Sequence, residues 1–182
     1  MDDSFDSSLE FTLAEEGGYT DHPSDARFAT NHGITLVRFR RFVRDPALGR
    51  DELKDIPCAT VRALYLADFW NRGRCDALPA GVDLMVFDHA VNAGSDRAGR
   101  ALQLACGQKR SDIDGAIGPD TLSRVALSDT LTLLDALAAM QRTGYRQMAA
   151  FGLFGESWLA RLDRRRAKAL ELMALDEPVS RR

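Results

Sequence analysis

The segment from Val82 to Asn92 constrains the fold most, because as a helix it would be apolar around almost its whole circumference. A surface helix carries an apolar stripe on one face only, whereas a helix that is apolar on all sides belongs in the interior. Gly94 follows closely, and glycine is the residue that most often ends a helix. We therefore predict a central buried helix over 82–92, with the other elements packed around it.

The rest of the chain also shows helical periodicity. Apolar residues recur at intervals of three and four, which is the spacing of one helical face. The segments concerned are 36–43, 59–70, 95–106 with Ser95 as N-cap, 130–151 and 158–175, and a further helix is expected after the turn at 118–120. No run indicates a strand longer than a few residues. With 182 residues and 45% hydrophobic content the chain can bury one core, so we predict a mainly α, single-domain protein over 1–182.

The first helix is expected to place Glu16 on its last turn. Ser7 and Glu10 have the spacing of a capping box, so the helix is predicted to begin near Ser7, and Gly17-Gly18 ends it. The free carbonyls at a helix C-terminus disfavour a carboxylate by about 0.3–1 kcal/mol, which favours the protonated form. Such a carboxyl can act as a general acid, although a glutamate before a glycine cap is also an ordinary surface residue.

The sequence from 16 to 35 reads EGGYTDHPSDARFATNHGIT. Its order of Glu16, Asp25 and Thr30 resembles the Glu, Asp, Thr constellation of phage-type lysozymes. The whole string resembles the N-terminal signature of glycoside hydrolase family 108, without a gap. Further matches to that family follow in its order, from about Leu9 to about Arg161: Tyr65 with Phe69-Trp70, the helix 87–94, Leu102-Gln103 and the turn 114–121.

This resemblance implies a lysozyme-like fold, with a small β-hairpin at the catalytic loop within Tyr19 to Ile34. It also implies a catalytic half over about 7–94 and a helical, peptidoglycan-binding-like half over about 95–175, which we expect to share one core. At two positions the chain departs from the family pattern. Arg27-Phe28 replace the usual pair of glycines, and His22 replaces an aspartate, so we expect a reshaped loop at the sugar groove.

The activity implied by the resemblance is hydrolysis of peptidoglycan after N-acetylmuramic acid. Glu16 would protonate the leaving oxygen, while Asp25 with Thr30 would activate water or Asp25 would stabilise the oxocarbenium ion. Likeness to phage-type lysozymes favours inversion. The expected substrate-binding residues are Tyr19, Phe28, His32, Trp70 and Asn92.

Three of the matched residues also have structural interpretations. Trp70 can equally belong to the core, because it ends an apolar run, and Asn92 can simply finish a helix. Asp88 is expected to be structural, with Arg142 or Arg161 as its partner in the core.

Neither a metal nor a cofactor is predicted. Cys58, Cys75 and Cys106 are widely spaced without a C-x-x-C pair, and the three histidines lack metal-ligand spacing. The N-terminus is acidic and does not resemble a signal peptide, and no apolar stretch has the length of a membrane span. We therefore expect a monomer made in the cytoplasm that acts on the cell wall after export or holin-type release.

Two clusters of basic residues leave other functions open. They lie at 38–44 and 161–168, within a chain of formal net charge −3. Such clusters can face anionic wall polymers or a nucleic acid, or they can simply be solvated helix faces. The alternatives to an enzyme are thus a catalytically silent wall-binding module, in which Arg27-Phe28 has spoiled the site, and a helical nucleic-acid binder.

Overall fold

The computed structural model describes residues 2–21 and 29–176. The contacts divide them into two compact units, which we call the hairpin unit (residues 9–68) and the helical unit (residues 2–8 and 69–176). Helix α1, Asp2–Glu16, contributes residues to both units. That the two units form one domain stays a prediction.

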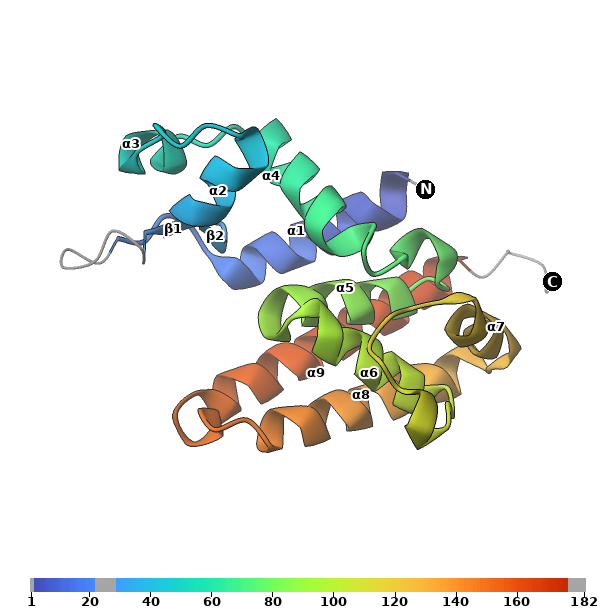
Figure 1. Cartoon of the computed structure of the whole chain (residues 1–182). Coiled ribbons are helices and arrows are strands. Elements are labelled where there is room, and N and C mark those ends of the chain that lie inside the picture. The colour runs from blue at the N-terminus through green and yellow to red at the C-terminus, as the bar shows by residue number, and fades with distance from the viewer. Residues whose placement is uncertain (1, 22–28, 177–182) are drawn as a thin grey trace. The chain divides into compact units, whose positions relative to one another are not determined.

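The hairpin unit combines short helices with one small sheet (Figure 1). After α1, strands β1 (Thr30–Asn31) and β2 (Ile34–Thr35) form an antiparallel hairpin. Helices α2 (Leu36–Val43), α3 (Arg50–Lys54) and α4 (Cys58–Tyr65) follow. The predicted small hairpin and the predicted helix over 36–43 are both confirmed, whereas the short helix α3 was not predicted.

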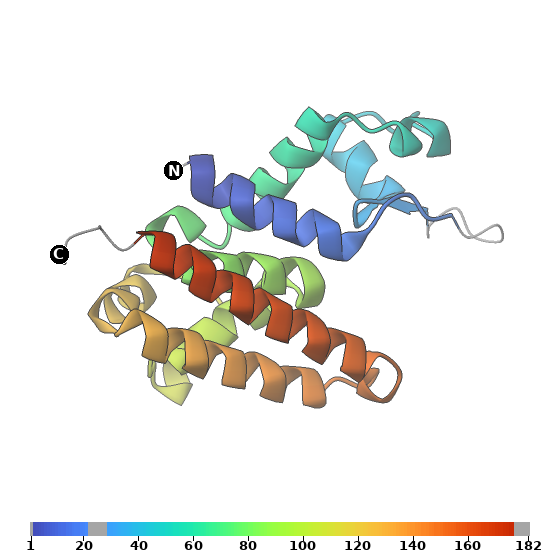
Figure 2. The same ribbon diagram turned by 180° about the vertical axis from the view of Figure 1, so that it is seen from behind.

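The helical unit is built around α5, Val82–Ala93. Ten of its twelve residues are buried, which confirms the central buried helix. Helices α6 (Ser95–Ala105), α8 (Thr130–Arg146) and α9 (Phe151–Asp176) each pack against α5. Figure 2 shows α8 and α9 lying side by side. The shorter elements are α7 (Pro119–Leu127), a π turn η2 (Leu66–Trp70) and two 3₁₀ turns, η3 (Cys75–Ala77) and η4 (Arg110–Asp112).

Several helix ends differ from the predictions. Helix α1 begins at Asp2 instead of near Ser7, because Phe5 is buried and packs edge-on against Trp70 and Phe87. Tertiary packing has thus overridden the capping-box pattern, and Ser7 lies inside the helix. The N-cap of α6 is Gly94, and the predicted cap Ser95 is the first helical residue.

The predicted helices over 59–70 and 158–175 also have different limits. The first is split, because α4 ends at Tyr65 and the wider π turn continues to Trp70. Helix α9 begins at Phe151, seven residues early, although two glycines lie in its first turns. Gly155 allows this start, since a Cβ there would come within 2.6 Å of the Phe151 ring.

Candidate active site

Glu16 is the last residue of α1, as predicted. The next residue, Gly17, has a left-handed backbone with φ of 74°, and its N–H donates to the carbonyl of Leu13 at 3.2 Å. A glycine in the left-handed conformation is a common way to end a helix, because it lacks a Cβ. The Glu16 side chain is half-buried, whereas Gly17 and Gly18 are exposed.

The carboxyl of Glu16 lies against the turn of the hairpin. Gly33 occupies this turn with φ of 69°, and a Cβ at that position would lie 3.0 Å from Cγ and Cδ of Glu16 and closer still to Oε2. Position 33 therefore favours glycine for two reasons: its left-handed backbone conformation and the carboxyl group of Glu16 beside it. The end of α1 and the turn of the hairpin together fix where the acid is held.

Side-chain hydrogen bonds of Asn31, in β1, and Tyr65, in α4, join this hairpin to neighbouring helices. The buried amide of Asn31 donates to the carbonyls of Leu53 at 3.1 Å and Lys54 at 2.9 Å, at the end of α3. The hydroxyl of Tyr65, in α4, donates to the carbonyl of His32 at 2.6 Å. His32 itself has φ of 49°, so the turn contains two successive left-handed residues, His32 and Gly33. These bonds give the two-residue strands a support that their own ladder does not supply.

Thr30 is joined to Thr20 by an isolated bridge next to the hairpin. Each backbone N–H donates to the other residue's carbonyl, at 2.8 and 2.9 Å, and the two hydroxyl oxygens lie 2.8 Å apart. Thr20 and Thr30 are therefore paired through both their backbones and their side chains. Asp25 and Phe28, the predicted second carboxylate and sugar contact, lie outside the described residues, as do His22 and Arg27.

Tyr19 and His32 lie close in sequence to this bridge and this turn. Tyr19 is half-buried, and burial together with the charge of Asp21 raises the pKa of its hydroxyl. Asp21 in turn forms an ion pair with Arg50, the first residue of α3, at 3.4 Å. His32 is half-buried in the turn. Both residues thus belong to the hairpin unit, together with Glu16 and Thr30.

Trp70 is a core residue, which corrects its predicted role as a sugar platform. Its side chain is 1% exposed and packs edge-on against Phe5 and Phe87. The indole N–H donates to Asp76 at 2.7 Å. The ring is therefore not accessible to a saccharide in the structure. The other interpretation, that Trp70 belongs to the core because it ends an apolar run, is confirmed.

Asn92 lies at the end of α5 and is half-buried. Its Oδ1 accepts a hydrogen bond from the hydroxyl of Tyr145, in α8, at 2.7 Å. The Nδ2 donors of the amide are not used in this bond and remain for a ligand.

Asp88 is structural, as predicted, and its partners are two arginines from α9. Arg161 donates to both carboxylate oxygens, at 3.0 and 2.6 Å, and Arg165 donates to Oδ2 at 2.5 Å. Burial alone would raise the pKa of Asp88, but the two guanidinium groups lower it to about 2. The predicted partner Arg142 is wrong, because Arg142 pairs with Asp163 instead.

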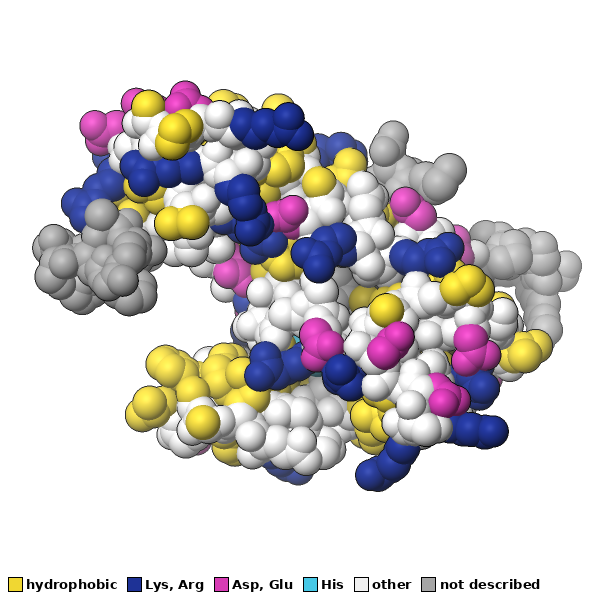
Figure 3. All heavy atoms as spheres, viewed as in Figure 1, with side chains coloured by type: hydrophobic (Ala, Val, Ile, Leu, Met, Phe, Trp, Pro, Cys, Tyr) yellow, Lys and Arg dark blue, Asp and Glu magenta, His cyan; other side chains and the backbone are white. Residues whose placement is uncertain are grey.

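Several residues of the two basic clusters are paired within the described part of the chain, whereas Arg41 and Arg44 are exposed and line a shallow surface hollow with Arg40. In the C-terminal cluster Arg161 and Arg165 are buried on Asp88, and Arg166 pairs with Asp135. In the other cluster, Arg38 and Arg41 pair with Asp68, and Arg40 donates to the carbonyl of Leu48. On the face shown in Figure 3, Lys and Arg side chains are scattered among other types in each unit. This arrangement does not support the nucleic-acid binder.

Two further features bear on the kind of site. Within 2–21 and 29–176, His, Cys, Asp and Glu side chains do not gather in groups of three or more that would hold a metal ion. Over the same residues, each helix is too short or too polar to cross a membrane.

Sequence analysis did not identify two of the residues that build this site, Thr20 and Gly33. Gly33 lay inside the matched string, but its contact with Glu16 depends on how α1 meets the hairpin. Thr20 gave no signal of its own, because a lone threonine in a loop is unremarkable. Tyr65 had been matched to the family, yet its hydrogen bond to the turn was not foreseen.

Comparison with known proteins places the chain in a family. Residues 9–94 match the family described as glycosyl hydrolase 108. Among solved structures, SagA of Brucella abortus is similar with a TM-score of 0.82 and 31% sequence identity, over 95% of this chain and 97% of that one. The curated proteins contain no match. The chain therefore belongs to glycosyl hydrolase family 108, a family of lysozyme-like glycoside hydrolases whose substrate is peptidoglycan.

Proposed function

We propose that this protein is an N-acetylmuramidase that cleaves the bond between N-acetylmuramic acid and N-acetylglucosamine, with Glu16 as the general acid. One observation carries the proposal: the carboxyl of Glu16 is held between the end of α1 and Gly33 of the hairpin turn. A general acid must be held within hydrogen-bond reach of the leaving oxygen, so a rigid support on two sides favours this role.

The surroundings of Glu16 leave room for a glycan. Gly17 and Gly18 follow it in the chain, and a Cβ on either would meet no described atom within 4 Å. A saccharide could approach along this open stretch of backbone. Tyr19 and His32, with Phe28, are proposed to contact the sugar rings, and the Nδ2 group of Asn92 is suited to donate to the carbonyl of an N-acetyl group.

Asp25 and Thr30 are proposed to handle the water molecule. A threonine hydroxyl can donate one hydrogen bond and accept two, so Thr30 can bind water while it keeps its bond to Thr20. Asp25 would then take the proton from that water, which gives inversion at the anomeric carbon. Alternatively, Asp25 would stabilise the developing oxocarbenium ion. A covalent intermediate on Asp25 would give retention. Proton NMR of the first product anomer during digestion distinguishes the two.

The bond that is cleaved can be identified from the products. Purified peptidoglycan is digested, the new reducing ends are reduced with borohydride, and the muropeptides are analysed by mass spectrometry. Reduced muramic acid ends are expected. Reduced glucosamine ends, free peptides or no products would contradict the proposal, and the last result would favour the silent wall-binding module.

We further propose that the protein works as a monomeric, single-domain enzyme on the cell wall, after export or holin-type release. Elution of the purified protein as a 20.1 kDa species in size-exclusion chromatography with light scattering would support the monomer.

A further inference from the structure

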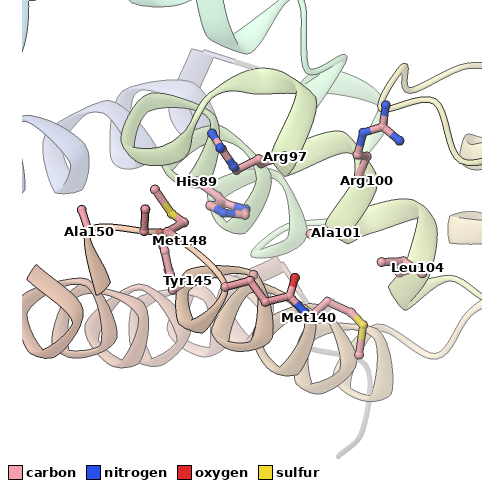
Figure 4. A pocket seen from close by; sticks show the side chains of 12 residues that line it. His89, Arg97, Arg100, Ala101, Leu104, Met140, Tyr145, Met148 and Ala150 are labelled. Carbon is pink, nitrogen blue, oxygen red and sulfur yellow. The ribbon is translucent and has the colours of Figure 1, made fainter. Parts of the chain in front are cut away.

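The helical unit contains a cavity of about 650 Å³ between α6, α8 and the turn that leads into α9. Its wall is largely apolar and includes Ala101, Leu104, Met140 and Met148. Figure 4 shows His89, from α5, among the side chains that line this cavity, with Arg97 beside it. Pockets that hold small ligands have this size and this mixture of an apolar lining with a few polar groups.

The imidazole of His89 is an unsatisfied polar group. The residue is 3% exposed, and its Nδ1 is buried without a hydrogen-bond partner among the described residues. Its ring packs edge-on against Tyr145, whose hydroxyl is already bonded to Asn92 and Arg165. Buried polar atoms nearly always have a partner, so the Nδ1 atom of His89, in the wall of this cavity, is available to bond a ligand.

The charge around His89 is positive. Burial, and then the charge of Arg165, lowers the pKa of His89 to about 3, and Arg97 acts in the same direction. The ring is therefore neutral near pH 7 and offers one N–H donor and one acceptor nitrogen. Asp88 opposes the lowering, but its carboxylate is bound to Arg161 and Arg165.

The two arginines at the cavity differ in what they can offer. Arg100 donates to Asp96 and to the carbonyls of Ile113 and Asp114, and its guanidinium points away from His89 in Figure 4. Arg97 is exposed, and a single described bond, from Nη1 to the carbonyl of Ala93 at 3.0 Å, holds it. Arg97 thus keeps donors and charge for a ligand.

Acidic side chains are absent from the described lining of the cavity. An anionic group placed between Arg97 and His89 would meet one cationic donor and one neutral donor, and it would meet no repelling charge. An apolar chain attached to it would extend along Leu104 and Met140. We infer that this cavity binds a small amphipathic carboxylate, with the carboxylate at Arg97 and His89 and a short hydrocarbon chain against the apolar wall. This inference does not depend on the proposed hydrolysis.

Two sources of this chemistry are tested with separate probes. Octanoate represents a fatty acyl carboxylate, and N-acetyl-leucyl-alanine represents the C-terminus of a peptide. Octan-1-ol has the chain without the charge. Binding to the full-length protein is measured by isothermal titration calorimetry at pH 7 and by NMR of the histidine side chains.

Arg97→Gln is the decisive variant. The glutamine amide can still donate to the Ala93 carbonyl but carries no charge. The matched control is Arg110→Gln, which removes the same charge from an exposed arginine outside the cavity lining. His89→Phe is a second variant that keeps a planar ring and removes both nitrogens.

The site predicts that at least one of the two carboxylates binds and shifts the His89 resonances. Arg97→Gln should weaken that binding by about tenfold or more, the size expected for a charge-assisted hydrogen bond, and Arg110→Gln should leave it unchanged. The carboxylate that binds more tightly identifies the source. The inference is overturned if neither carboxylate binds, if octan-1-ol binds as tightly as octanoate, or if the two arginine variants bind equally. If His89→Phe does not fold, the comparison of Arg97→Gln with Arg110→Gln still tests the inference.

Discussion

The Glu16 carboxyl and the Gly33 backbone touch, so that a Cβ at position 33 would come within 3.0 Å of the Glu16 side chain. This contact joins the end of a helix to the turn of a hairpin only two residues per strand long. The acid is thus held by two elements instead of one.

Gly33→Ala should lower activity more than stability. The left-handed backbone costs an L-residue about 1–2 kcal/mol, and the added methyl group displaces the Glu16 carboxyl. Gly107→Ala is the matched control, because Gly107 has a similar φ of 72° and open space around it. We expect similar loss of unfolding free energy in both variants but a fall of kcat only in Gly33→Ala. Equal kcat values would show that the contact does not matter for catalysis.

Tyr65→Phe tests the anchor of the turn. The change leaves the His32 carbonyl without its buried donor, which should cost about 1–2 kcal/mol of stability. Because His32 precedes Gly33, kcat should also fall at temperatures where the variant is fully folded. Urea unfolding and dye-release assays on peptidoglycan measure the two effects. Unchanged kcat in a destabilised variant would limit Tyr65 to a structural role.

Asp88→Asn should be the most destabilising of these changes. It leaves Arg161 and Arg165 buried without their counter-charge, and loss of one partner of a buried ion pair typically costs about 3–5 kcal/mol. Asp163→Asn breaks the exposed pair with Arg142 and should cost less than about 1 kcal/mol. Similar melting temperatures for the two variants would contradict the structural role of Asp88.

His89 should make stability depend on pH below 6.5. Its pKa is lowered from 6.5 to about 3 in the folded protein, so the unfolded chain binds more protons between these values. The free energy of unfolding therefore falls as the pH falls through this window, by about 2 kcal/mol between pH 6.5 and pH 5. Asp88 acts in the same direction but only between about pH 4 and pH 2. Denaturant titrations at pH 7 and pH 5 should show this loss in the wild type and a smaller one in His89→Phe; equal losses would contradict the assignment.

Local pattern was sufficient to predict most of the helices, but not the short helix α3, the exact helix limits or the contacts between helices. Helix α5 was predictable because its residues are apolar around almost the whole helix, and α2 because its apolar residues recur at helical spacing. The start of α1 was not, because the packing of Phe5 on Trp70 involves residues 65 positions apart. For the same reason, the burial of Trp70 under Phe5 could not be decided from the local sequence.

The candidate site shows the same division. The position of Glu16 at a helix end followed from the two glycines behind it. The contact of its carboxyl with Gly33 and the hydrogen bond of Tyr65 to the turn depend on how α1, the hairpin and α4 pack. Sequence periodicity carries no information about this packing.

The central claim is that Glu16 donates the proton to the leaving sugar, and one rate comparison tests it most directly. The release of reducing muramic acid ends from purified peptidoglycan is measured for the wild type, for Glu16→Gln and for Glu15→Gln, which changes the neighbouring carboxyl on the same helical turn. We predict that Glu16→Gln is slower by about 10²–10⁴-fold, whereas Glu15→Gln stays close to the wild type. Equal rates for the wild type and Glu16→Gln would contradict the account.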